Sequence, residues 1–408
     1  MALIDQFVAV AEESPYGTAA SLSRGVYCNP SEFTLTEDMQ RIPSTVRQPG
    51  QLANSSVFAK AFMGVSGSAA FDCLDKGIGL FIKHALGGFA SEDHPTETAT
   101  MKRMTFTPSA TSKLGLSLTT QLYKTFMDSS GRAQTYTGVK VLGVRFMGDV
   151  GGLVRMSLTL DGRDVYTSGD TISGTTVSGN PSITVTSTTG LYPGMRITGT
   201  GVPANSYIKS ITSATVFVLG DSSNASVNAS ASDTVTLTVS RGTVVAKVSS
   251  PSYPSGAQPF SWNGVGITID GIQCCASGFE VAYDFTMKTD RRHMCNSGLK
   301  DEPVVVDISK ATVSLKGLEA LAWTDAGANR EQSRYMSLTA GASLANCVIT
   351  CYTPGIASGV SKGKLEFQIP TAVATSGAQD MAGNQPAEFE ILGTPGLTVV
   401  YDTLDSSP

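Results

Sequence analysis

Two stretches of this chain share one pattern of glycines and alternating residues, and this repetition constrains the fold more than any other feature. The copies are Gly138–Asp161 and Gly264–Lys288. They align without a gap, and glycines coincide at their first position and again at Gly152 and Gly278. Each copy reads as a β-hairpin that ends in a long alternating strand. A hairpin present twice predicts a duplicated β domain, and duplicated β domains tend to build rings and tubes.

Length and composition favour an all-β protein of two or three domains. The chain has 408 residues, of which only 15% are charged, while Gly, Ser and Thr are abundant. Hydroxyl and β-branched side chains suit pleated surfaces, and glycine suits tight turns. The net charge of −5 argues against tight binding to nucleic acid, which needs clustered Lys and Arg. It still permits a surface along which nucleic acid slides without sticking.

The N-terminus and the cysteines bear on where the protein folds. No basic segment followed by an apolar run opens the chain, so we expect no signal peptide. No apolar run has the length of a membrane span, so we expect no membrane insertion. The seven cysteines are an odd number without a framework spacing, which favours folding with reduced thiols in a cytoplasm.

Composition and periodicity divide most of the chain into an arm and two β halves. Residues 1–54 carry few strong periods and several prolines, so we expect an extended arm and loop. Residues 55–169 and 240–408 each combine strands with a short packing helix, and the second half ends in a C-terminal arm. The expected helices are Asp75–Leu86 in the first half and Gly317–Trp323 in the second. The same strand–helix order in both halves supports duplication.

Residues 170–239, here called the insert, differ in kind from the rest. They are rich in Ser and Thr, poor in charge, and contain turn signals such as Ser178–Pro181. Short strands at regular spacing predict a small Ig-like or barrel-like β domain, placed in an exposed turn between the two copies of the hairpin. The expected strands are Ser182–Thr186, Met195–Thr198, Tyr207–Ile211, Thr215–Leu219 and Thr234–Val239.

Residues with metal-binding or catalytic chemistry are few. None of the three histidines, at positions 84, 94 and 293, has a second His or Cys at ligand spacing on the same element. Cys274 and Cys275 adjoin on a strand and therefore point to opposite faces. Cys347 and Cys351 are interpreted as small core residues, with a zinc site completed by Cys295 as the alternative. We therefore predict no metal, no cofactor and no enzymatic activity.

The alternating strands of the two hairpin copies each have one strictly polar face. Long antiparallel strands of this kind can form a closed barrel that is wet on one side. An ordinary sandwich whose outer face meets water is the alternative. The candidates to face the inside of such a barrel are Arg155, Ser157, Thr159, Asp161, Glu280, Asp284, Thr286 and Lys288.

Several features resemble the tail tube proteins of long, non-contractile phage tails. Ala11–Thr18 resembles the Glu-x-x-x-Tyr-Gly-Thr-like segment near the N-terminus of that family. The strand–helix order of Val65–Gly88, the paired glycine hairpins and the late strand Val304–Leu315 are also similar to it. This resemblance covers most of the chain outside the insert.

The insert has a resemblance of its own. Gly190–Pro203, continuing to Ile208–Ile211, is similar to a small β module that recurs in phage virion proteins. The shared pattern is Gly-Leu, then Gly-Met, then Gly-x-Gly-(Val/Ile)-Pro. This is the sharpest local match in the sequence, and it indicates a virion component more firmly than it indicates a tube.

The tail-tube resemblance implies a structural protein of the virion tail, assembled in the host cytoplasm. In such a protein both halves contribute strands to an inner β-barrel, and the rings stack into a tube. The lumen holds the tape measure protein and conducts genomic DNA, while the insert projects outward. Duplication favours three chains per ring with pseudo-sixfold symmetry, and a hexameric ring is the second expectation. A virion decoration or receptor-binding protein that uses the same β module is the alternative function.

Overall fold

The computed structural model places most of the chain in two compact units. Unit 1 comprises Met1–Phe7, Thr120–Tyr136 and Val165–Ser250, and unit 2 comprises Val8–Thr119, Thr137–Asp164 and Pro251–Pro408. The structure describes residues 6–43, 58–95, 101–125, 131–167, 170–189, 191, 193–221, 223, 225–240, 247–269, 271–293, 299–307, 311–316, 319–320, 343–344, 346–353, 363–370, 372–378, 388–393 and 396–408.

The chain is mainly β, as its composition predicts. The α-helices of the described residues are α1 (Gly79–Leu86) and α2 (Ala110–Lys113), and the 3-10 turns are η1 (Pro30–Glu32) and η2 (Trp262–Gly264). The strands are β1 (Gln6–Glu12), β2 (Arg24–Gly25), β3 (Phe33–Pro43), β4 (Phe58–Asp72), β5 (Gly87–Asp93), β6 (Lys102–Pro108), β7 (Leu118–Thr125), β8 (Gly131–Asp149), β9 (Arg155–Gly162), β10 (Asp164–Thr167), β11 (Asp170–Thr176), β12 (Ser182–Val185), β13 (Arg196–Thr198), β14 (Ser206–Ser213), β15 (Val216–Gly220), β16 (Asp233–Ser240), β17 (Val265–Ile269), β18 (Ile272–Cys275), β19 (Gly278–Asp284), β20 (Met287–Lys288), β21 (Val304–Val305), β22 (Ala311–Lys316), β23 (Glu319–Ala320), β24 (Ser343–Leu344), β25 (Cys347–Tyr352), β26 (Lys364–Ile369), β27 (Ala372–Ala378), β28 (Glu388–Gly393) and β29 (Thr398–Thr403).

Unit 2 is built on two antiparallel sheets. In the described part of the chain, sheet I has 13 strands and branches at β8: one path is β3-β4-β9-β8-β19-β22-β28-β27-β24, and β10 and the run β2-β1-β7 also join at β8. In sheet II the order is β23-β18-β17-β25-β26-β29-β6-β5. The strands of sheet I that precede the insert in sequence lie on one side of the β8–β19 contact, and those that follow it lie on the other. One chain therefore supplies two successive runs of strands to a single sheet.

The core of unit 2 lies between the two sheets. Phe146 of β8 contacts Phe367 of β26 with ring centroids 4.7 Å apart. Helix α1 is buried along most of its length, and the ring of its Phe81 packs at a tilt against Phe71 of β4, with the ring centroids 5.1 Å apart. The alternation predicted for β9 and β19 is confirmed, because their apolar residues are the buried ones. These are Val154, Met156, Leu158, Leu160, Phe279, Val281 and Tyr283.

Only the first of the two predicted hairpins exists as such. In that copy, β8 and β9 pair across the turn that contains Gly151 and Gly152, as expected. In the second copy, β17 pairs with β18 in sheet II, while β19 joins sheet I and pairs with β8. The prediction of a duplicated hairpin is therefore wrong. Alternation assigns the faces of a strand, but it does not select the neighbouring strand.

The aligned glycines serve different purposes in the two copies. Gly138 has a φ of +63°, a left-handed conformation that glycine adopts at little cost. Gly264 instead lets the chain approach the backbone of Tyr352, with which a Cβ would collide. The shared glycine pattern therefore reflects two unrelated local requirements and does not establish a repeated structure.

The expectation of a loose N-terminal arm is wrong for the described part of residues 1–54. Strand β3 belongs to sheet I and pairs with β4 along its whole length, and its Phe33 and Leu35 are buried. Strand β1 likewise buries Val8, Ala9 and Val10. The prolines of this region lie outside the alternating positions that supply the core. They therefore do not interrupt the strand pattern at those positions.

The C-terminal segment is also fixed within unit 2, contrary to the expected arm. Thr403 Oγ1 donates a 2.6 Å hydrogen bond to the carbonyl oxygen of Asp75. The backbone N–H of Gly77 donates to Asp405 Oδ2 at 2.6 Å. Arg24 reaches the carbonyl oxygen of Pro408 at 2.6 Å. These contacts leave the segment after Tyr401 no freedom to act as an arm.

The two predicted packing helices have different outcomes. The first is confirmed as α1 from Gly79 to Leu86, while its predicted first turn, residues 75–78, is not helical; Gly87 follows the helix, and its N–H donates to the carbonyl of Lys83. The second, Gly317–Trp323, is described only at Glu319 and Ala320. Both residues form strand β23 against β18 and not a helix. Helical periodicity over seven residues is a weak signal when a neighbouring strand offers hydrogen bonds.

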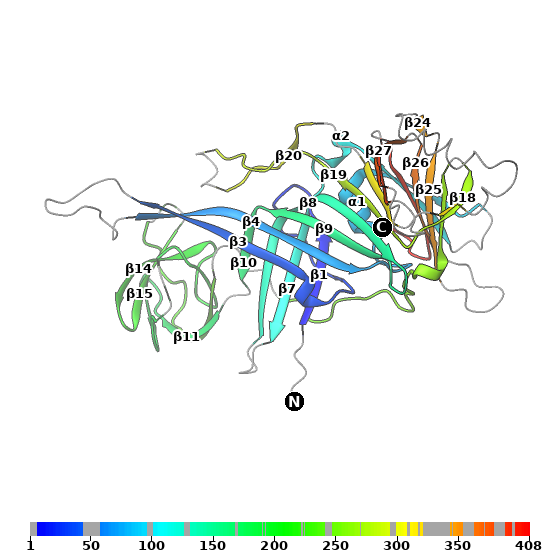
Figure 1. Ribbon diagram of the computed structural model, residues 1–408. Coiled ribbons are helices and arrows are strands. Elements are labelled where there is room, and N and C mark those ends of the chain that lie inside the picture. Colours follow the sequence, from blue (N-terminus) through cyan, green and yellow to red (C-terminus); the bar gives the residue numbers. More distant parts are fainter. Residues whose placement is uncertain are drawn as a thin grey trace, which may run out of the picture. The chain divides into compact units, whose positions relative to one another are not determined.

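Strands β3 and β4 extend beyond the rest of sheet I. Strand β9 pairs with β4 only from Val65 to Asp72. The pairing of β3 with β4 continues past Val65 for six further residue pairs, and the last five of these run from Met39↔Phe62 to Pro43↔Phe58 (Figure 1). We call the ten residues of these last five pairs the arm, as distinct from the N-terminal and C-terminal arms expected from the sequence. Its Met39 and Ile42 are 57% and 52% exposed.

The barrel-like alternative for the insert is confirmed in unit 1. Strands β11-β12-β15-β14-β13-β16 close into a barrel over Asp170–Ser240. The module pattern explains part of its packing, because Leu191, Met195 and Val202 lie against the barrel core. Gly190 and Tyr192 of that pattern lie outside the described residues. The core itself consists of Ile183, Val185, Ile197, Ile208, Phe217, Leu219, Ala229, Leu237 and Val239.

Candidate functional site

The candidate site is the face of sheet I that points away from the core. Residues directly opposite each other on paired strands share a face, so the register traces rows across the sheet. One row crosses β3, β4, β9, β8 and β19 and reads Thr34, Ser68, Thr159, Gly143 and Asp284. The face therefore runs without interruption across strands that precede the insert in the sequence and strands that follow it.

Small side chains form most of this face. Gly143 lies at its centre because Asp284 Oδ1 occupies the space that a Cβ would need. Thr34 and Ser68 bring their hydroxyl groups to 3.4 Å from each other. In the part of this face that the structure describes, many side chains are small or carry hydroxyl groups. The small members of the face are Thr34, Thr36, Ser66, Ser68, Ala70, Gly143, Ser157, Thr159, Ala282, Thr312 and Ser314.

Arg145, at the middle of this face, stands between two carboxylates. Its guanidinium lies 3.2 Å from Glu280 Oε1 and 3.8 Å from Asp284 Oδ2. All three side chains are at least one-third exposed, so the pairs contribute little to stability. Sequence reasoning missed Arg145, although its alternation with the buried Val144 and Phe146 could have placed it on this face.

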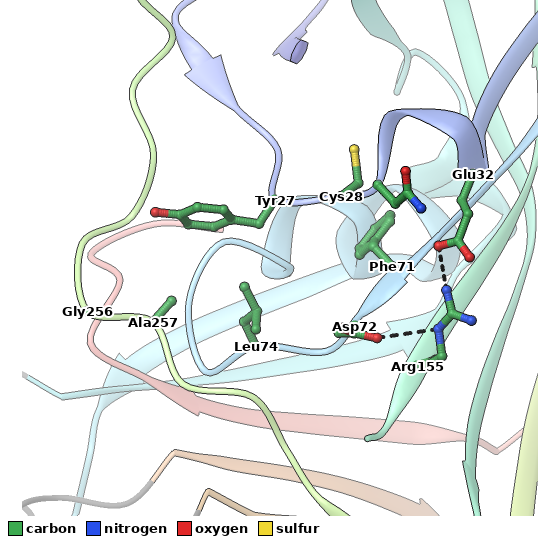
Figure 2. Close-up of a pocket in the computed structure, with 10 residues that line it drawn as sticks. Tyr27, Cys28, Glu32, Phe71, Asp72, Leu74, Arg155, Gly256 and Ala257 are labelled. Atoms are coloured by element: carbon green, nitrogen blue, oxygen red, sulfur yellow. Dashed lines mark hydrogen bonds and ion pairs between the residues drawn. The ribbon is translucent and has the colours of Figure 1, made fainter. Parts of the chain in front are cut away.

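Arg155 repeats this arrangement at one end of the face. Its Nη2 lies 2.5 Å from Glu32 Oε2, and its Nε lies 3.3 Å from Asp72 Oδ1. Figure 2 shows the two acids reaching the guanidinium from different elements, Glu32 from the turn η1 and Asp72 from the end of β4. The hydrogen bond that Arg155 donates to the Glu32 carboxylate raises the pKa of Arg155. Each arginine that the structure describes on this face is thus matched by two acids, and the described residues of the face form no cationic patch.

A cavity of about 460 Å³ adjoins Arg155. Its floor is apolar at Phe71 and Leu74, and Tyr27 forms one wall (Figure 2). The charged groups in its lining are already paired with each other, as described above for Arg155. The cavity therefore resembles a surface recess more than a catalytic cleft, which would present converging groups to a substrate.

The structure separates the remaining sequence candidates. Ser157, Thr159 and Glu280 lie on the polar face with Arg155 and Asp284. Asp161 has the same parity on β9, but it is only 5% exposed and forms an ion pair with Lys300. Thr286 and Lys288 lie beyond β19, and Lys288 belongs to the separate two-stranded ribbon of β20 and β21. Alternation in the sequence alone did not reveal that Asp161 is buried or that Lys288 belongs to a separate ribbon.

The histidines make polar contacts within unit 2. His84 Nε2 lies 2.9 Å from Glu12 Oε1, and His94 Nε2 lies 3.2 Å from Asp402 Oδ2. His293 contacts the carboxylate of Asp301. Burial lowers the pKa of His84, so its ring is neutral at neutral pH and donates to Glu12.

The burial of each cysteine discussed here follows from the face of the strand on which it lies. Cys347 and Cys351 are fully buried core residues of β25, whereas Cys295 lies outside the described residues. Cys274 is buried and its neighbour Cys275 is exposed, as expected for opposite faces of a strand. In the part of the chain that the structure describes, no group of three or more His, Cys, Asp and Glu side chains could hold a metal ion.

Comparison with known proteins found no matching family model and no similar curated protein. Among the helices of the described ranges, none is both long and apolar enough to cross a membrane.

Proposed function

We propose that this chain is a structural virion protein that polymerises into stacked rings and forms a phage tail tube through which DNA passes. The observation that carries the proposal is the polar face of sheet I. A conduit for a polyanion must be wet and smooth, and it must lack a cationic patch that would retain the phosphates. The small hydroxylated side chains and the arginines matched by two acids each meet these requirements.

The strand order supports three chains per ring. β3, β4, β9 and β8 precede the insert, and β19, β22, β28, β27 and β24 follow it, yet all belong to one sheet. A single chain thus contributes two runs of strands, as two subunits of a sixfold ring would. A ring of three chains then has pseudo-sixfold symmetry. A hexameric ring is the competing arrangement, and the tape measure protein is the expected occupant of the lumen before DNA.

Electron microscopy of the purified, concentrated protein tests the proposal. We expect rings or tubes with an open centre, and a two-dimensional average down the particle axis should show outward knobs formed by the insert. Three knobs establish the trimer and six establish the hexamer. Compact monomers or solid trimers over a range of salt and protein concentrations would contradict the tube and favour a decoration or receptor-binding protein.

Removing the insert should leave polymerisation intact. Asp170 and Val239 are direct partners in β11 and β16, so a short Gly-Ser turn can join the chain at its two ends. The insert also has its own core, so its removal takes away a set of apolar residues that pack against one another. We expect tubes of unchanged diameter without knobs. A deleted protein that remains folded by circular dichroism but does not polymerise would show that the insert forms part of the ring.

A further inference from the structure

Lys300 and Asp161 form a contact in the interior of unit 2. Lys300 Nζ lies 2.5 Å from Asp161 Oδ1, and the two residues are 139 positions apart in sequence. Lys300 is 7% exposed and Asp161 is 5% exposed. Asp161 lies near the end of β9, before the insert, and Lys300 precedes β21, after it. The contact therefore joins the two halves of the chain where water has little access.

The second oxygen of Asp161 distinguishes this contact from an ordinary buried ion pair. Asp161 Oδ2 is buried and has no hydrogen-bond partner among the described residues. A buried carboxylate ion usually has both oxygens bonded, because leaving one without a donor is costly. The neutral acid avoids the cost of burying a charge, and it is the form of Asp161 that an amine can convert into an amide.

Asp38 supplies a third carboxyl group beside this pair. In the β3–β4 register it faces Gly64, and the end of the Lys300 side chain lies against Gly64, where a Cβ would collide with it. The glycine thus makes room for the amine beside Asp161, and Asp38, whose carboxylate accepts from Ser66 at 3.3 Å, lies opposite this glycine on the neighbouring strand. Burial raises the pKa of Asp161, and the charge of Asp38 adds to this effect, while Lys300 and Arg292 oppose it.

We propose that Lys300 and Asp161 become joined by an intramolecular isopeptide bond, with Asp38 carrying the proton. The ammonium of Lys300 first gives a proton to the carboxylate of Asp161. The free amine Nζ then attacks Cγ and forms the C–N bond. Asp38 takes the second proton from nitrogen and delivers it to the departing hydroxyl, so that the C–O bond breaks and water leaves. The ammonium and carboxylate are converted into one amide and one water, without an oxidant or other co-reactant.

Such a bond would stabilise the chain as a cross-link does, even where the thiols are kept reduced. Closing a long loop lowers the conformational entropy of the unfolded chain, as a disulfide does. Disulfides do not persist in a reducing cytoplasm, but an amide does. The bond would connect β9 directly to the segment before β21 and resist their separation under load.

Mass spectrometry of the intact, folded protein tests the proposal directly. We expect a mass lower than that of the sequence by one water, and a tryptic peptide containing Asp161 joined to one containing Lys300. Lys140 and Glu302 provide an internal control, with Lys140 Nζ also 2.5 Å from Glu302 Oε1. That carboxylate is 25% exposed and its bonded oxygen also accepts from the N–H of Gly115, so we expect this pair to stay uncoupled.

Three variants separate the chemistry from a structural role. Lys300→Met should restore the full mass. Asp161→Asn should change the loss from one water to one ammonia, because the amine then displaces an amide nitrogen. Asp38→Asn should slow the appearance of the linked peptide at least tenfold in freshly refolded protein. The full sequence mass and separate peptides in wild-type protein, after prolonged incubation in the folded state, would overturn the proposal whatever the variants do.

Discussion

Replacing Glu13 with alanine is expected to destabilise unit 2 by about 4 kcal/mol or more, because each buried donor left without an acceptor costs about 1–3 kcal/mol. The Glu13 residue is 5% exposed. Its carboxylate accepts hydrogen bonds from the N–H groups of Gly17 and Gly138 and from the hydroxyls of Ser117 and Thr119, at 2.6–3.0 Å. This one side chain thus connects the end of β1 with β7 and β8.

Glutamine should not rescue this position, although it has nearly the same shape. Each oxygen of Glu13 already accepts from two or more donors. Oε1 accepts from Thr119 and Gly138, and Oε2 accepts from Gly17, Ser117 and Gly138. Either orientation of an amide therefore places an NH₂ group, which is only a donor, against other donors. We expect Glu13→Gln to lose most of the stability that Glu13→Ala loses.

Urea denaturation of the three proteins, followed by intrinsic fluorescence, measures the effect as a shift of the unfolding midpoint. Glu12→Gln is the matched control. The Glu12 side chain is 43% exposed and is bonded by Lys83 and His84, so its replacement should shift the midpoint far less. Equal shifts for the neighbouring positions, or a Glu13→Gln protein as stable as wild type, would contradict the role assigned to Glu13.

Strict alternation allowed most individual strands to be predicted from the sequence. β26 has the predicted bounds, Lys364–Ile369, because one of its faces is buried and the other is wet. Five of the six barrel strands of the insert were predictable for the same reason, but the first of them, β11, was not among the predicted strands. Strand neighbours were not, since β19 pairs with β8 across a separation of more than a hundred residues. Local periodicity carries no information about such pairing.

The candidate site was predictable to the same extent. Alternation placed Arg155 and Glu280 on the polar sides of their strands, and the register then brought these sides onto one face. Alternation could not show that Lys300 covers Asp161, because Lys300 lies in a segment that is distant from Asp161 in the sequence. It also gave no sign of β3, whose alternating Phe33 to Thr36 lies within a region punctuated by prolines. Both failures concern contacts that depend on tertiary structure.

Charging the arm should prevent polymerisation while leaving the fold intact. Met39 and Ile42 are more than half exposed, and apolar side chains of this size gain about 1.5–3 kcal/mol each when fully buried. If the arm packs against the next subunit, burying their exposed surface favours assembly. Met39→Asp combined with Ile42→Asp should therefore raise the critical concentration for polymerisation at least tenfold, since about 1.4 kcal/mol corresponds to a factor of ten.

Sedimentation of polymer across a concentration series measures this effect, and the insert supplies its control. Val177 is an apolar side chain of similar exposure, at 48%, on the part of the chain that the proposal places outside the ring. Val177→Asp should leave the critical concentration within about twofold of wild type, because surface substitutions away from a contact usually change free energies by less than 0.5 kcal/mol. An arm variant that polymerises like wild type would exclude the arm from the subunit interface. Equal loss in both variants would indicate a general effect of added charge, because the two sites would then be indistinguishable.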